Sequence, residues 1–526
     1  MRIFLHSFFI LSIFFQHVYN FIDNLQTEDW HGQYGKTFPG HIRGPRKLSD
    51  RIGIVGAGPS GIHMAYLLKQ RGFKNIQILE ASNRIGGKSR TINYRGANHE
   101  MGTCYLSADY EHNILRLVNQ FTQSATKPPP IASVWSRLTP NSSVTFNHYY
   151  SMVLKMKYPN LNMMEIQGLF LRKLKTYVYL HKTMFGDYYG EIMPQPSPQI
   201  MEKIKGTFLD FLERNGLADL EEMFTASHTL QGYGRISEIP ALYGLMWNTP
   251  KVIGSLVELV KGKAGAIYML EDGFENLWRT IAEKNHLNVM FKSKVRHVML
   301  SGRHGNEKAY IYYINNGRLR YRKFDFLIWT PPVNTLMRIL SGVGLQEERK
   351  LFRGMTNSYY ATSLVDDVGG RRGQSSVNWW MENIKGGKDF SVWANRDAYT
   401  MFHDLNGMRY SQQQTVTGSD NQTEIRTSVF YQYSHNKPRK DHLASVLKRH
   451  LKKMGASSVE IIKQYPWKYF TRFTEPQLLS GAIWKVLELQ GKRNMWFVGA
   501  SVSFESVKSV VEYNQLLVDR MTEPNN

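Results

Sequence analysis

A strand, a glycine-rich turn and a helix follow one another early in the chain, and this pattern constrains the fold more than any other part of the sequence. The apolar run 52–55 leads directly into Gly-Ala-Gly-Pro-Ser-Gly at 56–61, and a helix-like stretch over 62–71 follows. A second apolar run, 76–79, ends at Glu80. This order predicts a βαβ unit with its glycines at the first strand–helix turn, and therefore a Rossmann-like parallel sheet.

The three glycines of this turn each meet a different requirement of a dinucleotide site. Gly56 permits the tight turn, Gly58 lets the backbone approach a pyrophosphate, and Gly61 lets helix and strand pack closely. The pyrophosphate is then expected at the helix N-terminus, where unpaired N–H groups favour an anion. The carboxylate of Glu80 can accept hydrogen bonds from ribose hydroxyls and repels a 2′-phosphate, so the pattern favours FAD or NAD over NADP.

The residues after Glu80 distinguish between these two cofactors. Arg84-Ile85-Gly86-Gly87-Lys88 resembles the second signature of the flavin-dependent amine oxidase superfamily. In that family the paired glycines bring backbone N–H groups against the FAD diphosphate, and the basic residues offset its charge. The resemblance therefore implies FAD as the cofactor.

Several later segments resemble the same superfamily. They are the turn at 272–277, the expected strand at 289–298, the buried strand and proline loop at 324–332, and the last strand and helix over 494–518. The helix is expected to start near Phe504 and to direct its N-terminal dipole at the flavin ring. The resemblance implies an α/β fold in which a Rossmann-like FAD-binding domain is interleaved with a mixed α+β substrate domain.

The resemblance also implies a set of cofactor contacts, in which Val295 holds the adenine through its backbone. The expected contacts are Gly56, Gly58, Pro59, Ser60, Gly61, Glu80, Arg84, Gly86, Gly87, Lys88, Glu100, Met101, Gly102, Val295, Gly499, Ala500 and Val507. One position departs from the family, because Ala500 stands where most members have a glutamate that bonds a ribityl hydroxyl. Ser501 could supply one acceptor in its place. A flavoprotein relative with weak catalysis and a binding role is therefore one alternative.

The domains expected from this pattern are discontinuous. The FAD-binding domain is assigned to 51–107, 265–335 and 455–526, and the substrate domain to 108–264 and 336–454. Residues 1–20 are assigned to a signal peptide and 21–50 to a linker.

The N-terminus has the pattern of a secretory signal. Arg2 precedes a mostly apolar run over 3–15, which is too short to span a bilayer as a helix. We therefore expect a secreted or secretory-pathway protein, with an uncleaved N-terminal anchor as the alternative. Sequons at Asn141 and Asn421 would then be candidates for glycosylation.

Cysteine content and charge limit the remaining possibilities. Cys104 is the only cysteine, which excludes an internal disulfide and a CxxC zinc site, and no metal site is expected. A flavin link through Cys104 is conceivable beside the alternative of a buried, inert thiol. The net charge of +23 favours anionic membrane surfaces or acidic substrates. The basic residues are spread along the chain, so nucleic acid is not expected, and the oligomeric state stays open.

Within the superfamily, the segments 53–101, 232–234 with 239–243, 467–470 and 490–521 resemble the polyenoic fatty acid isomerase-like flavoproteins. The resemblance implies that an unsaturated fatty acid or lipid transfers a hydride to flavin, with a redox-neutral shift of a double bond as one outcome. The alternative is an amine or amino-acid oxidase that produces peroxide. The flavin carries the chemistry, and Tyr233, Tyr243 and Trp467 are candidate walls of an apolar substrate tunnel, with Arg137 as a candidate for the head group.

Overall fold

The computed structural model describes most of the chain beyond residue 39. The described ranges are 40–107, 110–122, 126–127, 134–139, 142–186, 193–254, 267–303, 306–369, 377–397, 400–404, 407–411, 413–418 and 421–525. The expected signal peptide 1–20, the linker up to residue 39 and the sequon residue Asn141 lie outside these ranges.

A five-stranded parallel sheet forms the centre of the first domain. Its strand order is β10-β2-β1-β14-β24, and every neighbouring pair is parallel. The strands are β1 (Ile52–Val55), β2 (Ile76–Leu79), β10 (Val289–Met290), β14 (Phe326–Trp329) and β24 (Met495–Phe497). All residues of β1, β14 and β24 are buried, as expected for strands covered on both faces. The α/β fold expected from the sequence is confirmed.

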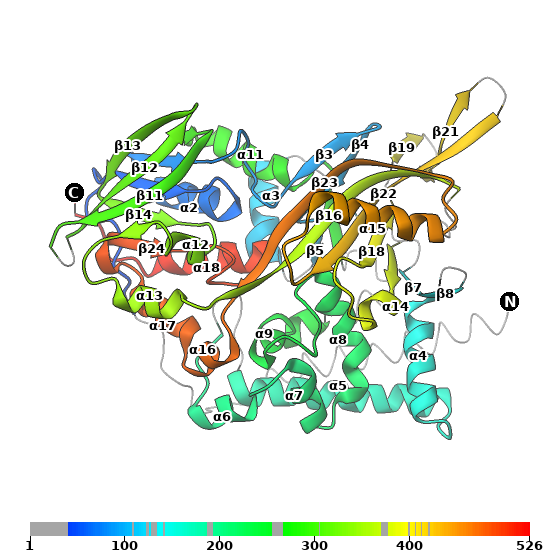
Figure 1. Cartoon of the computed structure of the whole chain (residues 1–526). Coiled ribbons are helices and arrows are strands. Elements are labelled where there is room, and N and C mark those ends of the chain that lie inside the picture. The colour runs from blue at the N-terminus through cyan, green and yellow to red at the C-terminus, as the bar shows by residue number, and fades with distance from the viewer. Residues whose placement is uncertain are drawn as a thin grey trace.

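Three long helices flank this sheet. They are α2 (Pro59–Gln70), α11 (Phe274–Lys284) and α18 (Val507–Asp519), and α2 packs against both of the others (Figure 1). The C-terminal helix α18 therefore completes a layer begun at residue 59. Shorter helices of the same half are α3 (Arg116–Phe121), α12 (Val333–Leu336), α13 (Gln346–Phe352), α16 (Glu475–Leu479) and α17 (Ala482–Leu489).

The expected single strand over 289–298 is two strands in two sheets. Lys292 has a φ of 52°, a left-handed conformation that turns the chain between them. The second strand belongs to a four-stranded sheet of order β13-β12-β11-β15, made of β11 (Ser293–Ser301), β12 (Lys308–Asn315), β13 (Arg318–Phe324) and β15 (Leu340–Ser341). Val295 therefore lies in β11 and not in the parallel sheet.

The second domain is built on an eight-stranded sheet. Its main path is β23-β16-β22-β18-β17-β7-β8, and β21 pairs with β22. The strands are β7 (Val134–Thr139), β8 (Ser142–Thr145), β16 (Thr356–Val368), β17 (Val377–Trp380), β18 (Val392–Asp397), β21 (Gln413–Gly418), β22 (Asn421–Ser434) and β23 (Ser458–Arg472). Small sheets pair β3 (Thr91–Tyr94) with β4 (Ala97–Glu100), β19 (Thr400–Asp404) with β20 (Gly407–Ser411), and β9 (Ile267–Leu270) with β5 (Leu106–Ser107) and β6 (Thr126–Lys127).

The expected domain boundary at residue 455 needs correction. Strand β23 pairs with β16 along nearly its whole length, from Thr356 opposite Arg472 to Val368 opposite Ser458. Residues 458–472 therefore belong to the large sheet, and the last segment of the cofactor domain begins after them.

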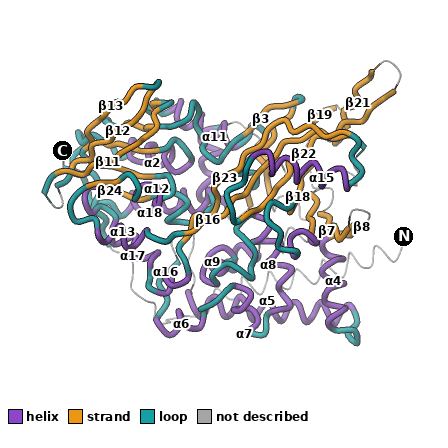
Figure 2. Tube along the Cα trace, in the orientation of Figure 1, coloured by secondary structure: helices purple, strands orange, loops and turns teal. Residues whose placement is uncertain are grey.

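Helices pack on both faces of this large sheet. They are α4 (Phe146–Lys157), α5 (Met163–Phe185), α6 (Pro198–Lys203), α7 (Phe208–Arg214), α8 (Glu221–Ser227) and α9 (Ala241–Trp247), with α14 (Met381–Lys385) and α15 (Lys440–Lys453) against its strands. Helix α4 packs against Tyr431 and Tyr433 on one face, and α15 packs against Phe430 on the other. Figure 2 shows α4 to α9 gathered together at the lower end of the molecule.

The described end of the expected linker is part of the folded cofactor domain. Ile42 is buried and forms a parallel β-bridge with Met521, and Lys47 forms another with Asn525. Residues 42–47 are therefore held against the C-terminal segment, and the linker assignment is wrong for them.

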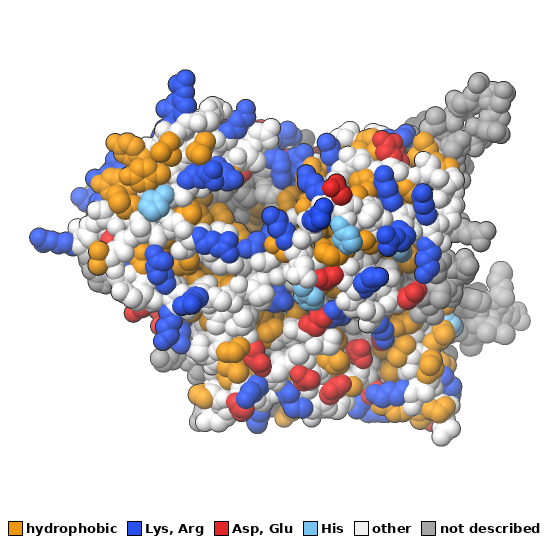
Figure 3. Space-filling view, viewed as in Figure 1, with side chains coloured by type: hydrophobic (Ala, Val, Ile, Leu, Met, Phe, Trp, Pro, Cys, Tyr) orange, Lys and Arg blue, Asp and Glu red, His pale blue; other side chains and the backbone are white. Residues whose placement is uncertain are grey.

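The distribution of surface charge and the length of apolar helices are both relevant to membrane contact. Lys and Arg side chains are scattered over the face shown in Figure 3, without one compact stripe. Within the described residues, no helix combines the length and the apolar character that crossing a bilayer requires.

Candidate active site

A cavity of about 520 Å³ opens at the carboxyl ends of the parallel strands and extends to the large sheet. Ligands of open α/β sheets bind at this edge. The expected cofactor contacts that line it are Gly56, Gly58, Pro59, Ser60, Glu80, Gly87, Lys88, Gly102, Gly499, Ala500 and Val507. Residues far apart in the sequence thus meet at one site.

The glycine turn forms a wall without side chains. Gly56 has a φ of 99°, and a Cβ there would lie 2.4 Å from Thr330 Oγ1. A Cβ on Gly58 would have Gly87 Cα as its nearest neighbour at 3.7 Å, so the two glycine segments face each other closely. Gly61 lies behind this wall, where a Cβ would be 1.9 Å from the Gly56 carbonyl oxygen. The cradle fits a long, thin anion such as a dinucleotide diphosphate.

Glu80 lines the cavity and also holds its loops. Its Oε2 accepts a hydrogen bond from the Ala57 N–H at 2.8 Å, and its Oε1 accepts one from the Ser82 N–H at 2.7 Å. A carboxylate oxygen has more than one lone pair, so each can accept a further hydroxyl donor. This arrangement fits a ribose contact.

Arg84 and Gly86 support the cavity from outside its lining. Arg84 donates to the Ile85 carbonyl at 3.1 Å and lies 3.6 Å from a carboxylate oxygen of Glu275. Gly86 has a φ of 109°, and a Cβ there would lie 2.5 Å from the Ser89 carbonyl oxygen. Both residues therefore shape the loop that carries Gly87 and Lys88.

Besides Gly61, Arg84 and Gly86, three further expected contacts do not line the cavity. Glu100 is buried and accepts the Phe274 N–H at 2.7 Å, which ties strand β4 to the start of α11. Burial raises the pKa of its carboxyl to about 8. The Met101 carbonyl accepts the Trp467 indole N–H at 2.7 Å, and Val295 lies in the four-stranded sheet. The neighbouring Gly102 does line the cavity.

The segment around Ala500 contains an acid that the sequence analysis missed. Ser501 Oγ accepts the Val333 N–H at 3.1 Å, so it is already engaged. Glu505 lines the cavity, is buried, forms an ion pair with Lys88, and accepts the Phe470 N–H at 2.8 Å. The available signal was that Glu505 is the only acidic residue between Gly499 and Val511.

Helix α18 begins at Val507, three residues after the expected start near Phe504. Ser506 caps it, since its Oγ accepts the Ser509 N–H. Ser506, Val507 and Val510 all line the cavity. The helix N-terminus is therefore directed at the cofactor end, where its dipole favours negative charge.

Aromatic side chains enclose the other end of the cavity. Tyr233 stacks on Tyr469 with ring centroids 6.0 Å apart, and Tyr360 stacks on Tyr431 at 5.6 Å. Burial raises the pKa of the Tyr233, Tyr360 and Tyr469 hydroxyls well above the usual value, so they stay neutral. Further aromatic lining comes from Tyr110, Trp247, Trp379 and Trp467.

Of the three expected tunnel walls, two line the cavity and one does not. Tyr233 and Trp467 line it, whereas Tyr243 lies behind its wall. The Tyr243 hydroxyl accepts the Phe473 N–H at 2.9 Å, and its ring meets Phe470 edge-on at 5.2 Å. Tyr243 therefore packs the wall.

One buried cation reaches the aromatic end. Arg396 lies on β18, is 4% exposed, lines the cavity, and donates from Nη2 to the Glu100 carbonyl at 3.0 Å. Sequence analysis missed it because nothing near residue 396 resembles a motif. The alternative considered there, Arg137, lies on β7, and the description of that strand does not extend to its side chain.

Cys104 also lines the cavity, and its thiol is buried. Burial raises its pKa to about 11, which keeps the thiol protonated at neutral pH. A protonated thiol is a poor nucleophile, so the environment favours the inert role over a covalent flavin link.

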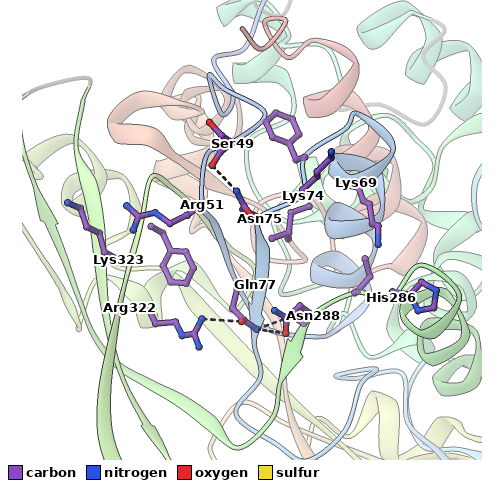
Figure 4. Close-up of a pocket in the computed structure, with 14 residues that line it drawn as sticks. Ser49, Arg51, Lys69, Lys74, Asn75, Gln77, His286, Asn288, Arg322 and Lys323 are labelled. Carbon is purple, nitrogen blue, oxygen red and sulfur yellow. Dashed lines mark hydrogen bonds between the residues drawn. The ribbon is translucent and has the colours of Figure 1, made fainter. Parts of the chain in front are cut away.

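A second pocket, of about 690 Å³, lies at the opposite edge of the parallel sheet (Figure 4). Its lining includes Arg51, Asn75 and Asn288, which precede strands β1, β2 and β10. Arg51 is paired with Asp325 at 3.0 Å, and Arg322 donates to Gln77 at 3.4 Å. None of the expected cofactor contacts is among its lining residues, so it is not the cofactor site.

The fold, together with the cavity that the glycine turn lines, defines a two-domain flavoprotein of the FAD-binding Rossmann type. The family model for flavin containing amine oxidoreductases matches residues 59–365. The chain therefore belongs to that family, and it is an FAD-dependent oxidoreductase or isomerase.

One curated protein and two solved structures are distant in sequence but cover most of the chain. The polyenoic fatty acid isomerase of Ptilota filicina is 22% identical over 499 residues, covering 88% of this chain and 93% of that protein. The crystal structure of a CLA-producing fatty acid isomerase from P. acnes is similar with a TM-score of 0.67 at 19% identity, over 90% of this chain and 99% of that one. A putrescine oxidase structure is similar with a TM-score of 0.61 at 14% identity, over 90% and 99%. At these identities the structures show the fold alone.

Proposed function

We propose that the protein acts on an unsaturated fatty acid, whose carboxylate binds Arg396 and whose chain lies between the aromatic walls toward the flavin. The observation that carries this proposal is the buried arginine at the aromatic end of the cavity. A guanidinium binds a carboxylate through charge-assisted hydrogen bonds, which are strongest where water is excluded. The similarity to two fatty acid isomerases supports the same substrate class.

The reaction that we favour is the redox-neutral shift of a double bond. When bound, FAD can accept a hydride from one carbon of the substrate and return it to another, so no external oxidant is needed. The residues of this chain orient the substrate and exclude water. Tyr233, Tyr360 and Tyr469 keep their protons, because burial raises the pKa of each hydroxyl.

Amine oxidation is the second candidate, and Glu505 is the feature that favours it. A buried carboxylate in the cavity can attract a cationic amine, but this one is already paired with Lys88. Arg396 would repel an ammonium group from the aromatic end. Fatty acid substrates should raise diene absorbance without oxygen uptake, whereas amine oxidation should release peroxide.

The Arg396→Met variant tests the head-group contact. We expect its affinity for a polyunsaturated fatty acid, read from the flavin spectrum, to fall by about 10- to 150-fold, which corresponds to a lost charge-assisted hydrogen bond of about 1.5–3 kcal/mol. Affinity for the methyl ester should change little, and Arg396→Lys should recover part of the loss. Lys463→Met is the control, since Lys463 is an exposed cation on strand β23 of the same sheet and outside the cavity lining. Equal losses for acid and ester would contradict the proposal.

A further inference from the structure

Four methionines are exposed at the corner where α4 meets α5. Met152 is 38% exposed, Met156 81%, Met163 48% and Met164 70%. Met152 and Met156 are one turn apart on α4, and the other two begin α5. Methionine is usually buried, so this concentration of flexible apolar side chains is a candidate contact surface.

The turn at this corner is fixed by its own hydrogen bonds. Lys155 Nζ donates to the Pro159 carbonyl at 2.8 Å and to the Leu161 carbonyl at 2.5 Å. Asn162 caps α5 through the Glu165 N–H in a capping box. Hydrogen bonds therefore fix the turn that joins the end of α4, with Met152 and Met156, to the start of α5, with Met163 and Met164.

The same helical pair is strongly cationic. Residues 146–185 contain six Lys or Arg residues and one Glu. Lys157 and Lys173 pair with Asp219 at 2.6 and 3.8 Å, and that single acid is buried and belongs to the neighbouring 3₁₀ turn. Apolar and cationic side chains lie over α4 and the start of α5 at the lower right of Figure 3. This combination of side chains matches a binding partner whose surface is anionic and whose interior is apolar.

The inner face of α4 covers the aromatic end of the cavity. Phe146 meets Trp379, which lines the cavity, edge-on with ring centroids 5.0 Å apart. Tyr149 is buried in a cluster with Leu230 and Tyr360, which line the cavity as well. Helix α4 therefore exposes Met152 and Met156 and, through its buried residues, contacts the lining of the candidate substrate site.

We propose that the α4–α5 corner docks on an anionic lipid bilayer, with Met152, Met156, Met163 and Met164 in the interface and the lysines against the head groups. Apolar insertion and attraction to anionic lipid together determine the strength of such binding. The docking itself stands on exposure and charge. The additional idea, that docking brings the cavity close to its substrate, rests on the proposed function.

Vesicle sedimentation tests the docking with the full-length holoprotein. We expect binding to phosphatidylcholine vesicles that contain phosphatidylserine to exceed binding to phosphatidylcholine alone by about tenfold, and the Met156→Glu, Met164→Glu double variant to lose this gain. Leu319→Glu on β13 is the control, because Leu319 is 67% exposed on another cationic surface. Flavin content and circular dichroism should match the wild type in both variants.

Three results would overturn the proposal: no preference of the wild type for anionic vesicles, unchanged binding by the double methionine variant, or loss of binding in Leu319→Glu alone. Turnover assays distinguish a failure of the docking proposal from a failure of the proposed function. The double variant should turn over dispersed fatty acid normally and lose only turnover of fatty acid embedded in vesicles. If neither dispersed nor embedded fatty acid is turned over while vesicle binding is intact, the proposed substrate is rejected and the proposed docking surface is retained.

Discussion

At the scale of single residues, the cofactor end combines an unusual alanine with an unexpected acid. Ala500 supplies no side-chain acceptor, and the hydroxyl of Ser501 is engaged by the Val333 N–H. The carboxylate at this end comes from Glu505, whose charge is offset by Lys88. The ion pair therefore sets the local potential where the helix α18 N-terminus also points.

The Glu505→Gln variant should shift the reduction potential of bound flavin to more positive values. Gln keeps an acceptor for the Phe470 N–H but leaves the charge of Lys88 without its partner, which stabilises the anionic, reduced flavin. A shift of tens of millivolts is expected, where about 30 mV corresponds to about 1.4 kcal/mol for two electrons. Spectroelectrochemistry measures it, and Lys88→Met should move the potential the opposite way. An unchanged or more negative potential in Glu505→Gln would reject this role.

Glu100 should make the protein less stable as the pH rises from 5 to 8. Its pKa is raised from 4.5 to about 8 in the folded state, so in that window the folded chain holds a proton that the unfolded chain releases. The free energy of unfolding should then fall by up to about 1.4 kcal/mol per pH unit and level off above the folded pKa. Urea unfolding at several pH values measures the slope. Glu100→Gln should flatten it, and an equal slope in that variant would assign the effect to other groups.

At the scale of elements, the contact between β1 and α2 depends on close backbone approach. Gly61 is in the first turn of α2 and faces the Gly56 carbonyl across a gap that admits no side chain. Gly58 is the N-cap residue of that helix, and it lines the cavity opposite Gly87. Two glycines of one motif thus have different roles, one in packing and one in binding.

The Gly61→Ala and Gly58→Ala variants should separate these roles. Gly61→Ala places a Cβ 1.9 Å from a carbonyl oxygen, so the helix must move, at a cost of about 1–3 kcal/mol or more in the free energy of unfolding. In Gly58→Ala the nearest atom is at an ordinary 3.7 Å, and stability of the apoprotein should change little. Urea unfolding midpoints of the two apoproteins provide the comparison. Equal midpoints would show that the helix adjusts freely.

At the scale of the whole molecule, the cofactor domain is assembled from segments separated by most of the chain. The parallel sheet takes strands from residues 52 to 497, and the bridge between Ile42 and Met521 joins the described ends. The large sheet and the cofactor domain both contribute residues to the lining of the cavity. Ligand binding at this junction should therefore stabilise the entire fold and not one segment.

Added FAD should raise the unfolding temperature of the apoprotein. At about one hundred times the dissociation constant, a ligand of the folded state adds about 2.7 kcal/mol to the free energy of unfolding. The Gly58→Leu variant, whose side chain would enter the cavity, should be colourless and show no FAD-dependent shift. Differential scanning fluorimetry, with absorbance at flavin wavelengths, measures both effects. A yellow Gly58→Leu protein would contradict the placement of the cofactor.

The sequence alone determined the βαβ unit, its cofactor class and the glycine cradle. These depend on local rules, because a positive φ, a missing Cβ and a buried apolar strand are visible in a few consecutive residues. The same locality explains the error at 289–298, where the turn at Lys292 splits one apolar run between two sheets.

Only the tertiary structure decided which side chains meet at the substrate end. Tyr360, Arg396 and Tyr431 come from β16, β18 and β22, and their convergence depends on which strands pair and in what register. A register shift of one residue would turn each side chain to the other face of the sheet. Burial likewise depends on packing, and it is burial that neutralises Glu100 and keeps Cys104 protonated. No local pattern carries that information, since strand pairing joins residues tens of positions apart.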